Sequence, residues 1–101
     1  MDPIINAVLK PKSIAVIGAS TNPEKIGYKV VQNLKDCGYQ NPVYPINTDA
    51  EEILGYKCYA NIKDVPYVVD MAVITVPARF VATVTRDAGE KGVKGVSIIT
   101  S

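Results

Sequence analysis

The stretch Ser13-Ile14-Ala15-Val16-Ile17-Gly18-Ala19-Ser20 decides the fold of this chain of 101 residues. The strand predicted over 13–18 has an apolar, mostly β-branched centre and ends at a glycine, which is typical of a strand buried on both faces. In residues 23–37 the apolar side chains recur at helical spacing, and Gly38 follows as a stop. A buried strand followed directly by a helix indicates the first unit of a parallel α/β sheet.

The rest of the chain continues this alternation. A second helix is predicted where Phe80, Val81, Val84 and Ala88 share one face, and it ends at Gly89 or Gly92. The other expected elements are strands over 43–46, 71–76 and 95–100, an edge strand within 53–59, a helical turn over 61–66 and a helix near 4–9. With right-handed crossovers they predict an α/β fold: a Rossmann-like parallel sheet in the order 3-2-1-4-5 with helices on both faces.

Size and charge exclude several classes of function. A mass of 10.9 kDa corresponds to one small domain spanning residues 1–101. The chain has 11 basic and 10 acidic residues, which argues against nucleic acid or an anionic membrane surface as its partner. It contains no histidine, so histidine bases, histidine metal ligands and histidine phosphocarriers are excluded, and we expect no metal site.

Two further features indicate the compartment. No apolar run approaches the ~18 residues of a membrane span, and the start Met1-Asp2-Pro3 lacks the basic region of a signal peptide. Cys37 and Cys58 form no metal motif, and buried free thiols are the simplest interpretation. We therefore expect a cytoplasmic protein.

The last predicted strand, 95–100, reaches the end of the chain. In a doubly wound fold a helix would normally follow and cover that strand. We therefore expect a fragment of a longer chain, truncated after this strand, with an apolar face left open that favours association between copies. Alternatively, the helix near 4–9 covers part of this face.

The candidate site follows from the topology, because ligands of open α/β sheets bind outside the carboxyl ends of the strands. Gly18 permits a sharp turn after the first strand. Asn22 is predicted as the N-cap of the first helix and Pro23 as its first residue, so that the helix start faces the strand end, where phosphate binds well. An ordinary capped helix without a ligand fits the local sequence equally well.

Two nucleotide motifs can be tested directly. A G-x-G-x-x-G pattern starting at Gly18 would need glycines where Ser20 and Pro23 stand. The acidic residue that reads a ribose is also missing from the end of the second strand, which reads Asn47. A nicotinamide dinucleotide is therefore disfavoured, and the Gly-Lys-Ser/Thr phosphate loop is absent.

Several segments in order carry a family resemblance. They are Lys12-Ser13-Ile14-Ala15-Val16-Ile17-Gly18-Ala19-Ser20 with Gly27, then Val43-Tyr44-Pro45-Ile46-Asn47, Glu52-Ile53-Leu54-Gly55, Val76-Pro77-Ala78-Arg79-Phe80 and Gly92-Val93-Lys94-Gly95. Together they resemble the CoA-binding domain of ADP-forming acyl-CoA synthetases, the group that includes the alpha subunits of acetate–CoA ligase and succinyl-CoA synthetase. The likeness covers nearly all of the chain.

The resemblance implies a Rossmann-like domain that binds coenzyme A. Its pyrophosphate turn falls on Ser20, Thr21, Asn22 and Pro23, next to Gly18, and Asn47 ends the neighbouring strand. In the family a turn stiffened by proline supports the adenine or pantetheine, and this turn falls on Val76, Pro77 and Ala78. The end of the last strand would border the thiol, and it falls on Ile99, Thr100 and Ser101.

Two departures from the family limit what the chain can do. The family's phosphorylated histidine lies in the following domain, so this chain alone cannot perform the ligase reaction and would need the remaining domains or a beta subunit as partners. Relatives often carry a lysine after the second strand, where this chain reads Asn47-Thr48-Asp49. Asp49 would either repel a CoA phosphate, or point to solvent or cap the turn at 50–53.

Three functions therefore compete. They are the CoA-binding module of an ADP-forming acid–CoA ligase, a stand-alone CoA-binding regulatory protein, and an NAD(P)-binding domain. The failed glycine pattern weighs against the last.

Overall fold

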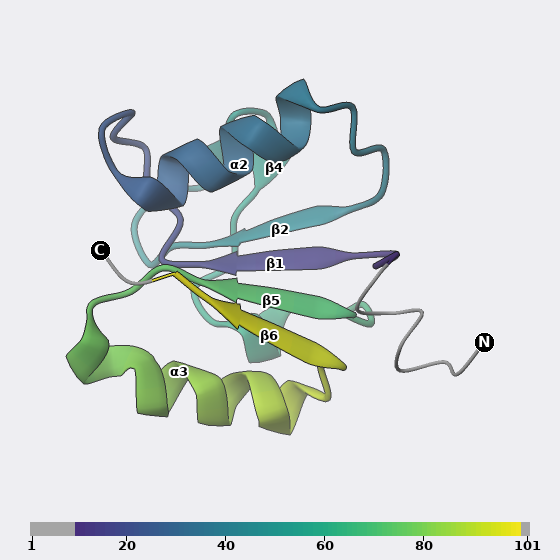
Figure 1. Cartoon of the computed structure of the whole chain (residues 1–101), viewed down its shortest axis with the longest axis vertical. Coiled ribbons are helices and arrows are strands. Elements are labelled where there is room, and N and C mark those ends of the chain that lie inside the picture. The colour runs from purple at the N-terminus through teal and green to yellow at the C-terminus, as the bar shows by residue number, and fades with distance from the viewer. Residues whose placement is uncertain (1–9, 100–101) are drawn as a thin grey trace.

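The computed structural model describes residues 10–99 and shows a parallel sheet between two helices (Figure 1). Helix α2 (Ile26–Asp36) lies on one face and α3 (Ala78–Lys91) on the other. The sheet has the order β2-β1-β5-β6, with strands β1 (Ile14–Ile17), β2 (Val43–Ile46), β5 (Met71–Ile74) and β6 (Gly95–Ile98). The predicted α/β class and Rossmann-like sheet are confirmed. The helix expected near 4–9 lies outside the described residues.

The central strand β1 is buried along its whole length, as its sequence predicts. Ile14 and Val16 belong to the apolar cluster beneath α2, whereas Ala15 and Ile17 belong to the cluster beneath α3. Since successive side chains of a strand point to opposite faces, four consecutive apolar residues are what a strand covered on both sides requires.

The edge strand expected within 53–59 is wrong in its pairing. The segment forms a separate antiparallel hairpin of β3 (Glu52–Ile53) and β4 (Tyr56–Lys57), and joins the main sheet only through a bridge from Tyr59 to Ile46. Pro45 explains the break. Its carbonyl faces the outer edge of β2 and accepts the N–H of Tyr59. The backbone nitrogen of Pro45 faces the same edge, and because it carries no hydrogen it cannot donate the bond that a longer ladder would need there. The helical turn expected at 61–66 is present as η1 (Ile62–Asp64).

The predicted start of the first helix is also wrong. Helix α2 begins at Ile26, and its N-cap is Lys25, which makes no side-chain capping bond. Asn22 instead closes a turn: its side-chain oxygen accepts the N–H of Glu24 at 3.0 Å, and its carbonyl accepts the N–H of Lys25 at 3.0 Å. Pro23 occupies the second position of this turn, where its fixed φ fits as well as it would in a first helical turn.

The apolar face predicted for the second helix, α3, is confirmed except at Phe80. Val81, Val84 and Ala88 pack on the core beneath the sheet, but Phe80 is 46% exposed. At 100° per residue Phe80 lies about 80° around the helix from Ala88, at the margin of the face. The guanidinium of Arg79 lies 4.7 Å from the centre of the Phe80 ring and covers part of it. The helix ends at Gly92, one of the two predicted stops, with φ of 93°.

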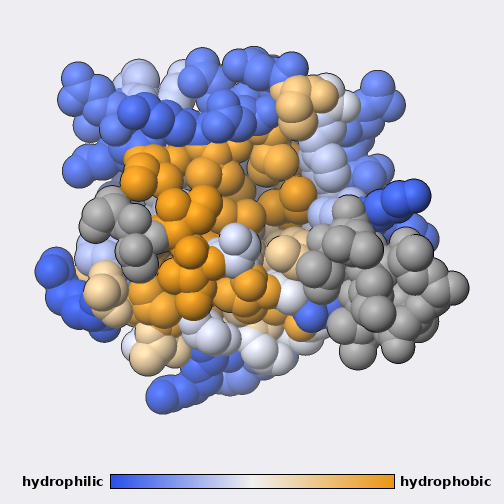
Figure 2. Space-filling model, in the orientation of Figure 1, coloured by the Kyte–Doolittle hydropathy of each residue, from blue (hydrophilic) through white to orange (hydrophobic). Residues whose placement is uncertain are grey.

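An apolar face is open at the β6 edge of the sheet, as expected from the sequence. Val96 is 37% exposed and Ile98 is 49% exposed. Figure 2 shows apolar side chains gathered between the two helices on this side of the molecule. Association of copies through this face stays a prediction.

Helix α2 approaches the sheet closely at Gly27. A Cβ at this position would stand 2.8 Å from the carbonyl carbon of Gly18 and 3.0 Å from the Cα of Ala19. These are backbone atoms that no rotamer change can move. A side chain at Gly27 would therefore push the start of α2 away from the end of β1.

We expect Gly27→Ala to lower the free energy of unfolding by about 3 kcal/mol, because the overpacked backbone must shift. Gly89→Ala is the matched control: Gly89 is also helical, nothing lies within 4 Å of its added Cβ, and the gain in helix propensity should stabilise by about 0.5–1 kcal/mol. Urea denaturation followed by circular dichroism measures both. Equal effects of the two substitutions would contradict the close contact.

Candidate ligand-binding groove

The carboxyl ends of the strands and the starts of both helices lie at one end of the molecule (Figure 1). Three adjoining clefts line this end, and we name them by their position. The central cleft lies between the ends of β1 and β2, the helix-start cleft lies beside the start of α2, and the acidic cleft lies beside the β3–β4 hairpin. The central cleft shares Gly18 and Val76 with the helix-start cleft, and Asn47, Thr48, Asp49 and Ala60 with the acidic cleft. The three clefts therefore adjoin one another at this end of the molecule, and we refer to them together as the groove.

The central cleft, of about 300 Å³, has an apolar floor. Ile17 and Ile46 come from the last residues of two neighbouring strands, and Val84 comes from α3. Gly18 turns the chain away above this floor with φ of 93°. Such a surface suits a flat or extended apolar part of a ligand.

The helix-start cleft, of about 400 Å³, brings polar groups together. Ser20, Thr75 and the oppositely charged pair Glu24 and Lys25 line it with the backbone of Gly18 and Gly27. The side-chain oxygen of Ser20 accepts the N–H of Asn22 at 3.0 Å, which leaves its own proton to donate. Helix α2 has no side-chain cap here, so its first N–H groups face this end with the positive side of the helix dipole. These features favour an anionic group.

The acidic cleft, of about 630 Å³, is lined by side chains with a net negative charge. It is lined by Asp49, Glu51 and Glu52 with a single cation, Lys57. The buried Cys58 also lines it. The two ends of the groove therefore differ in charge.

Asn47 holds the groove in shape by cross-linking two loops. Its amide nitrogen donates to the carbonyl of Ala19 at 2.9 Å, and its side-chain oxygen accepts the N–H groups of Asp49 at 2.7 Å and of Ala50 at 2.8 Å. The turn at 50–53 is thus capped by Asn47, which corrects the alternative that Asp49 caps it. Asp49 itself is exposed at the junction of the central and acidic clefts.

The structure gathers part of the predicted site. Gly18, Ser20, Asn47, Val76 and Pro77 line the groove. The remaining predicted residues lie off its walls: Thr21, Asn22 and Pro23 in the exposed turn, Ala78 at the start of α3, and Ile99 after β6. Thr100 and Ser101 lie outside the described residues.

Several wall residues are not among the predicted site residues. Lys25 lies just after the turn, within the range where the sequence predicts helix. Thr75 lies within the range where the sequence predicts a strand, but its hydroxyl donates to the carbonyl of Ile17 at 3.0 Å, and the residue lines the helix-start cleft. Ala60 lines two clefts and has no signal in the sequence.

The comparison with protein families matches residues 12–101 to the family described as CoA binding domain. The chain belongs to this family. A relative among curated proteins is the alpha subunit of acetate–CoA ligase (ADP-forming) I of Pyrococcus furiosus, 48% identical over 101 residues, which cover 96% of this chain and 22% of that subunit.

Two solved structures extend the comparison. The dinucleotide-forming acetyl-coenzyme A synthetase 1 of Ca. Korarchaeum cryptofilum, in complex with phosphate and ADP, superposes with a TM-score of 0.93 at 46% identity and covers 96% of this chain and 21% of that one. A conserved hypothetical protein from Pyrococcus furiosus superposes with a TM-score of 0.78 at 36% identity and covers 86% of this chain and 73% of that one.

The chain spans about a fifth of the length of the synthetases that it matches. Their homology confirms the resemblance found in the sequence, and the fold agrees with a CoA-binding domain. Within residues 10–99, no helix is long and apolar enough to cross a membrane.

The two cysteines differ, and the expectation of two buried thiols is wrong for one of them. Cys37 is exposed at the end of α2, because it follows the last turn of the helix rather than its apolar face. Cys58 is buried, and burial raises the pKa of its thiol, with a smaller contribution from the charge of Glu52.

We expect Cys37 to react with a thiol reagent at pH 7 much faster than Cys58. The thiolate is the reactive form, and a raised pKa lowers its fraction at neutral pH. Absorbance during reaction with a chromogenic disulfide should show one fast and one slow thiol, and Cys37→Ser should remove the fast phase. Loss of the slow phase in that variant would contradict the assignment.

Proposed function

We propose that this chain is the CoA-binding module of an ADP-forming acid–CoA ligase and that coenzyme A lies along the groove at the carboxyl ends of the strands. The observation that carries the proposal is that the clefts adjoin at the carboxyl ends of the strands, with the uncapped start of α2 beside one of them and an apolar floor in the next. Membership of the CoA-binding family and the similarity to synthetase subunits support it.

The residues present suit the parts of coenzyme A. Its pyrophosphate would lie at the helix-start cleft, where Ser20 donates a hydroxyl, Lys25 supplies a positive charge and the first N–H groups of α2 are available. Adenine or pantetheine would lie on the floor formed by Ile17, Ile46 and Val84. Bound CoA supplies the thiol that forms a thioester, whereas this chain binds and orients it.

The chain alone is not the catalyst. It contains no histidine that could carry a phosphoryl group, so this step would fall to further domains or to a beta subunit. The free thiols of Cys37 and Cys58 fit a reducing compartment such as the cytoplasm.

A stand-alone CoA-binding regulator is the second candidate. The hypothetical protein from Pyrococcus furiosus is short enough that this chain covers 73% of it. The full reading frame of the gene separates the two, because a ligase continues into a second domain with the phosphorylated histidine.

The purified chain should bind CoA more tightly than NADH. The turn after β1 has Ser20 and Pro23 where the fingerprint of a nicotinamide-dinucleotide loop has glycines, so the chain lacks the pattern that such a cofactor requires. Isothermal titration calorimetry with both ligands measures the difference. Tighter binding of NADH would overturn the proposed function.

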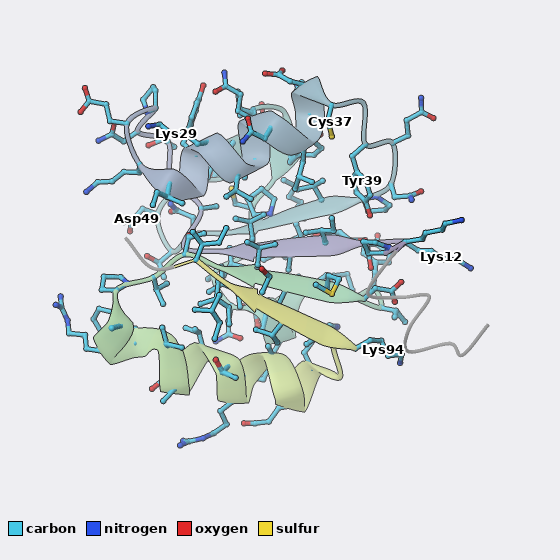
Figure 3. The ribbon with its side chains drawn as sticks, viewed as in Figure 1. Lys12, Lys29, Cys37, Tyr39, Asp49 and Lys94 are labelled. Carbon is cyan, nitrogen blue, oxygen red and sulfur yellow. The ribbon has the colours of Figure 1, made fainter. Side chains whose placement is uncertain are left out.

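Lys25→Glu should weaken CoA binding about tenfold, since it places a negative charge beside the pyrophosphate. Lys94→Glu is the matched control, because Lys94 lies at the opposite end of the sheet and changes the net charge equally (Figure 3). The same titration measures both variants. If both weaken CoA binding equally, only the net charge acts and the helix-start cleft does not hold the pyrophosphate.

A further inference from the structure

The two edges of the main sheet differ in how they are protected from further strands. At the β2 edge, Pro45 has no N–H to donate, and its carbonyl is already bonded to Tyr59. At the other edge, β6 pairs with β5, and no further strand lies beside it within residues 10–99 (Figure 1). Residues 95–99 contain no proline and no charged residue, which are features that keep many edge strands from pairing. The β6 edge is therefore open to another strand.

The backbone groups at this open edge belong to Val96 and Ile98. The N–H groups of Gly95 and Ile99 are bonded to carbonyls in or just before β5, at 3.2 Å and 2.8 Å. The backbone groups of successive residues in a strand point to opposite edges. Those of Val96 and Ile98 therefore point away from the sheet, where each residue offers one donor and one acceptor.

The side chains of β6 suit a second copy of the same strand. In an antiparallel pair with a two-fold axis at Ser97, Val96 of each copy would lie opposite Ile98 of the other, and the two residues would exchange both backbone hydrogen bonds. Val96 and Ile98 share one face of the sheet and are exposed, so they would form β-branched pairs across the strands. On the other face the exposed Ile99 would lie opposite Gly95, which has no side chain to obstruct it. The edge is therefore complementary to itself in hydrogen bonds and in shape.

We propose that the β6 edge is a self-association surface, through which two copies of the chain pair antiparallel over residues 95–99 and join their sheets into one. The pair is isologous, so it closes as a dimer, and the protected β2 edges stop the joined sheet from growing further. The inference does not depend on the proposed function, because none of these residues lines the groove.

A disulfide across the axis tests the register. Residues opposite each other in a non-hydrogen-bonded antiparallel pair have Cα atoms about 4.5 Å apart, within the range of about 4.4–6.8 Å that a disulfide needs. Ser97→Cys, made together with Cys37→Ser, should therefore give a covalent dimer on mild oxidation, seen by gel electrophoresis without reductant. The unaltered chain is the matched control: its exposed thiol, Cys37, lies at the end of α2, so it should cross-link much more slowly.

A charge swap tests the same contact without a covalent bond. Ser97 is exposed, and Ser97→Lys places two ammonium groups opposite each other at the axis. We expect the dissociation constant of the dimer to rise about fivefold at low salt, measured by sedimentation velocity over about a hundredfold range of protein concentration. Ser97→Asp should act likewise, and an equal mixture of the two variants should dimerise again because opposite charges then meet. Gln32→Lys, which adds the same charge on the exposed side of α2, should leave dimerisation unchanged.

Three results would overturn the inference. They are an unaltered chain that stays monomeric at every concentration, a dimer that Ser97→Lys does not weaken, and a dimer that Ser97→Cys fails to cross-link. A monomer throughout would leave the β6 edge to a strand of a different segment or protein. Binding of CoA should be equal in the unaltered chain and in Ser97→Lys, so the failure of this inference is distinguishable from a failure of the proposed function.

Discussion

The close contact between Gly27 and the turn at Gly18 is the constraint on which the site depends. A Cβ at Gly27 would overlap the backbone that leaves β1, so only a glycine lets α2 start directly above the strand end. This contact places the uncapped start of the helix beside Ser20 and Lys25, and it makes one wall of the groove from two elements. The anion-binding end of the site is therefore a consequence of backbone packing more than of any single polar side chain.

The parts of the fold that follow from burial could be predicted. Four consecutive apolar residues in β1 require cover on both faces, and this requirement alone leads to a parallel sheet with its ligands at the carboxyl ends. Gly18 is a site residue predicted from the topology, and the resemblance adds Asn47 and Val76. All three line the central cleft because each lies within two residues of the end of a strand.

The parts that depend on single hydrogen bonds could not be predicted. Pro23 fits a turn and a helix start equally well, and only the bonds of Asn22 to Glu24 and Lys25 decide between them. The missing N–H of Pro45 matters only once the outer edge of β2 is known. For the same reason Lys25 and Thr75, which reach the groove through their exact backbone positions, carry no pattern that spacing could reveal.

For Asn47 the predicted position at the groove is correct, but its predicted role as a ligand contact is only part of what the side chain does. It was predicted as a ligand contact at the end of the second strand, and it does line the groove. Its side-chain oxygen already accepts two backbone N–H groups and its nitrogen donates to Ala19, so one N–H remains for a ligand. Most of its hydrogen-bonding capacity therefore joins the loop after β2 to the turn after β1. Because Asn47 ties the loop that carries Asp49 to the turn after β1, the distance between the start of α2 and this loop is fixed by the protein. A ligand that contacts both must span that distance.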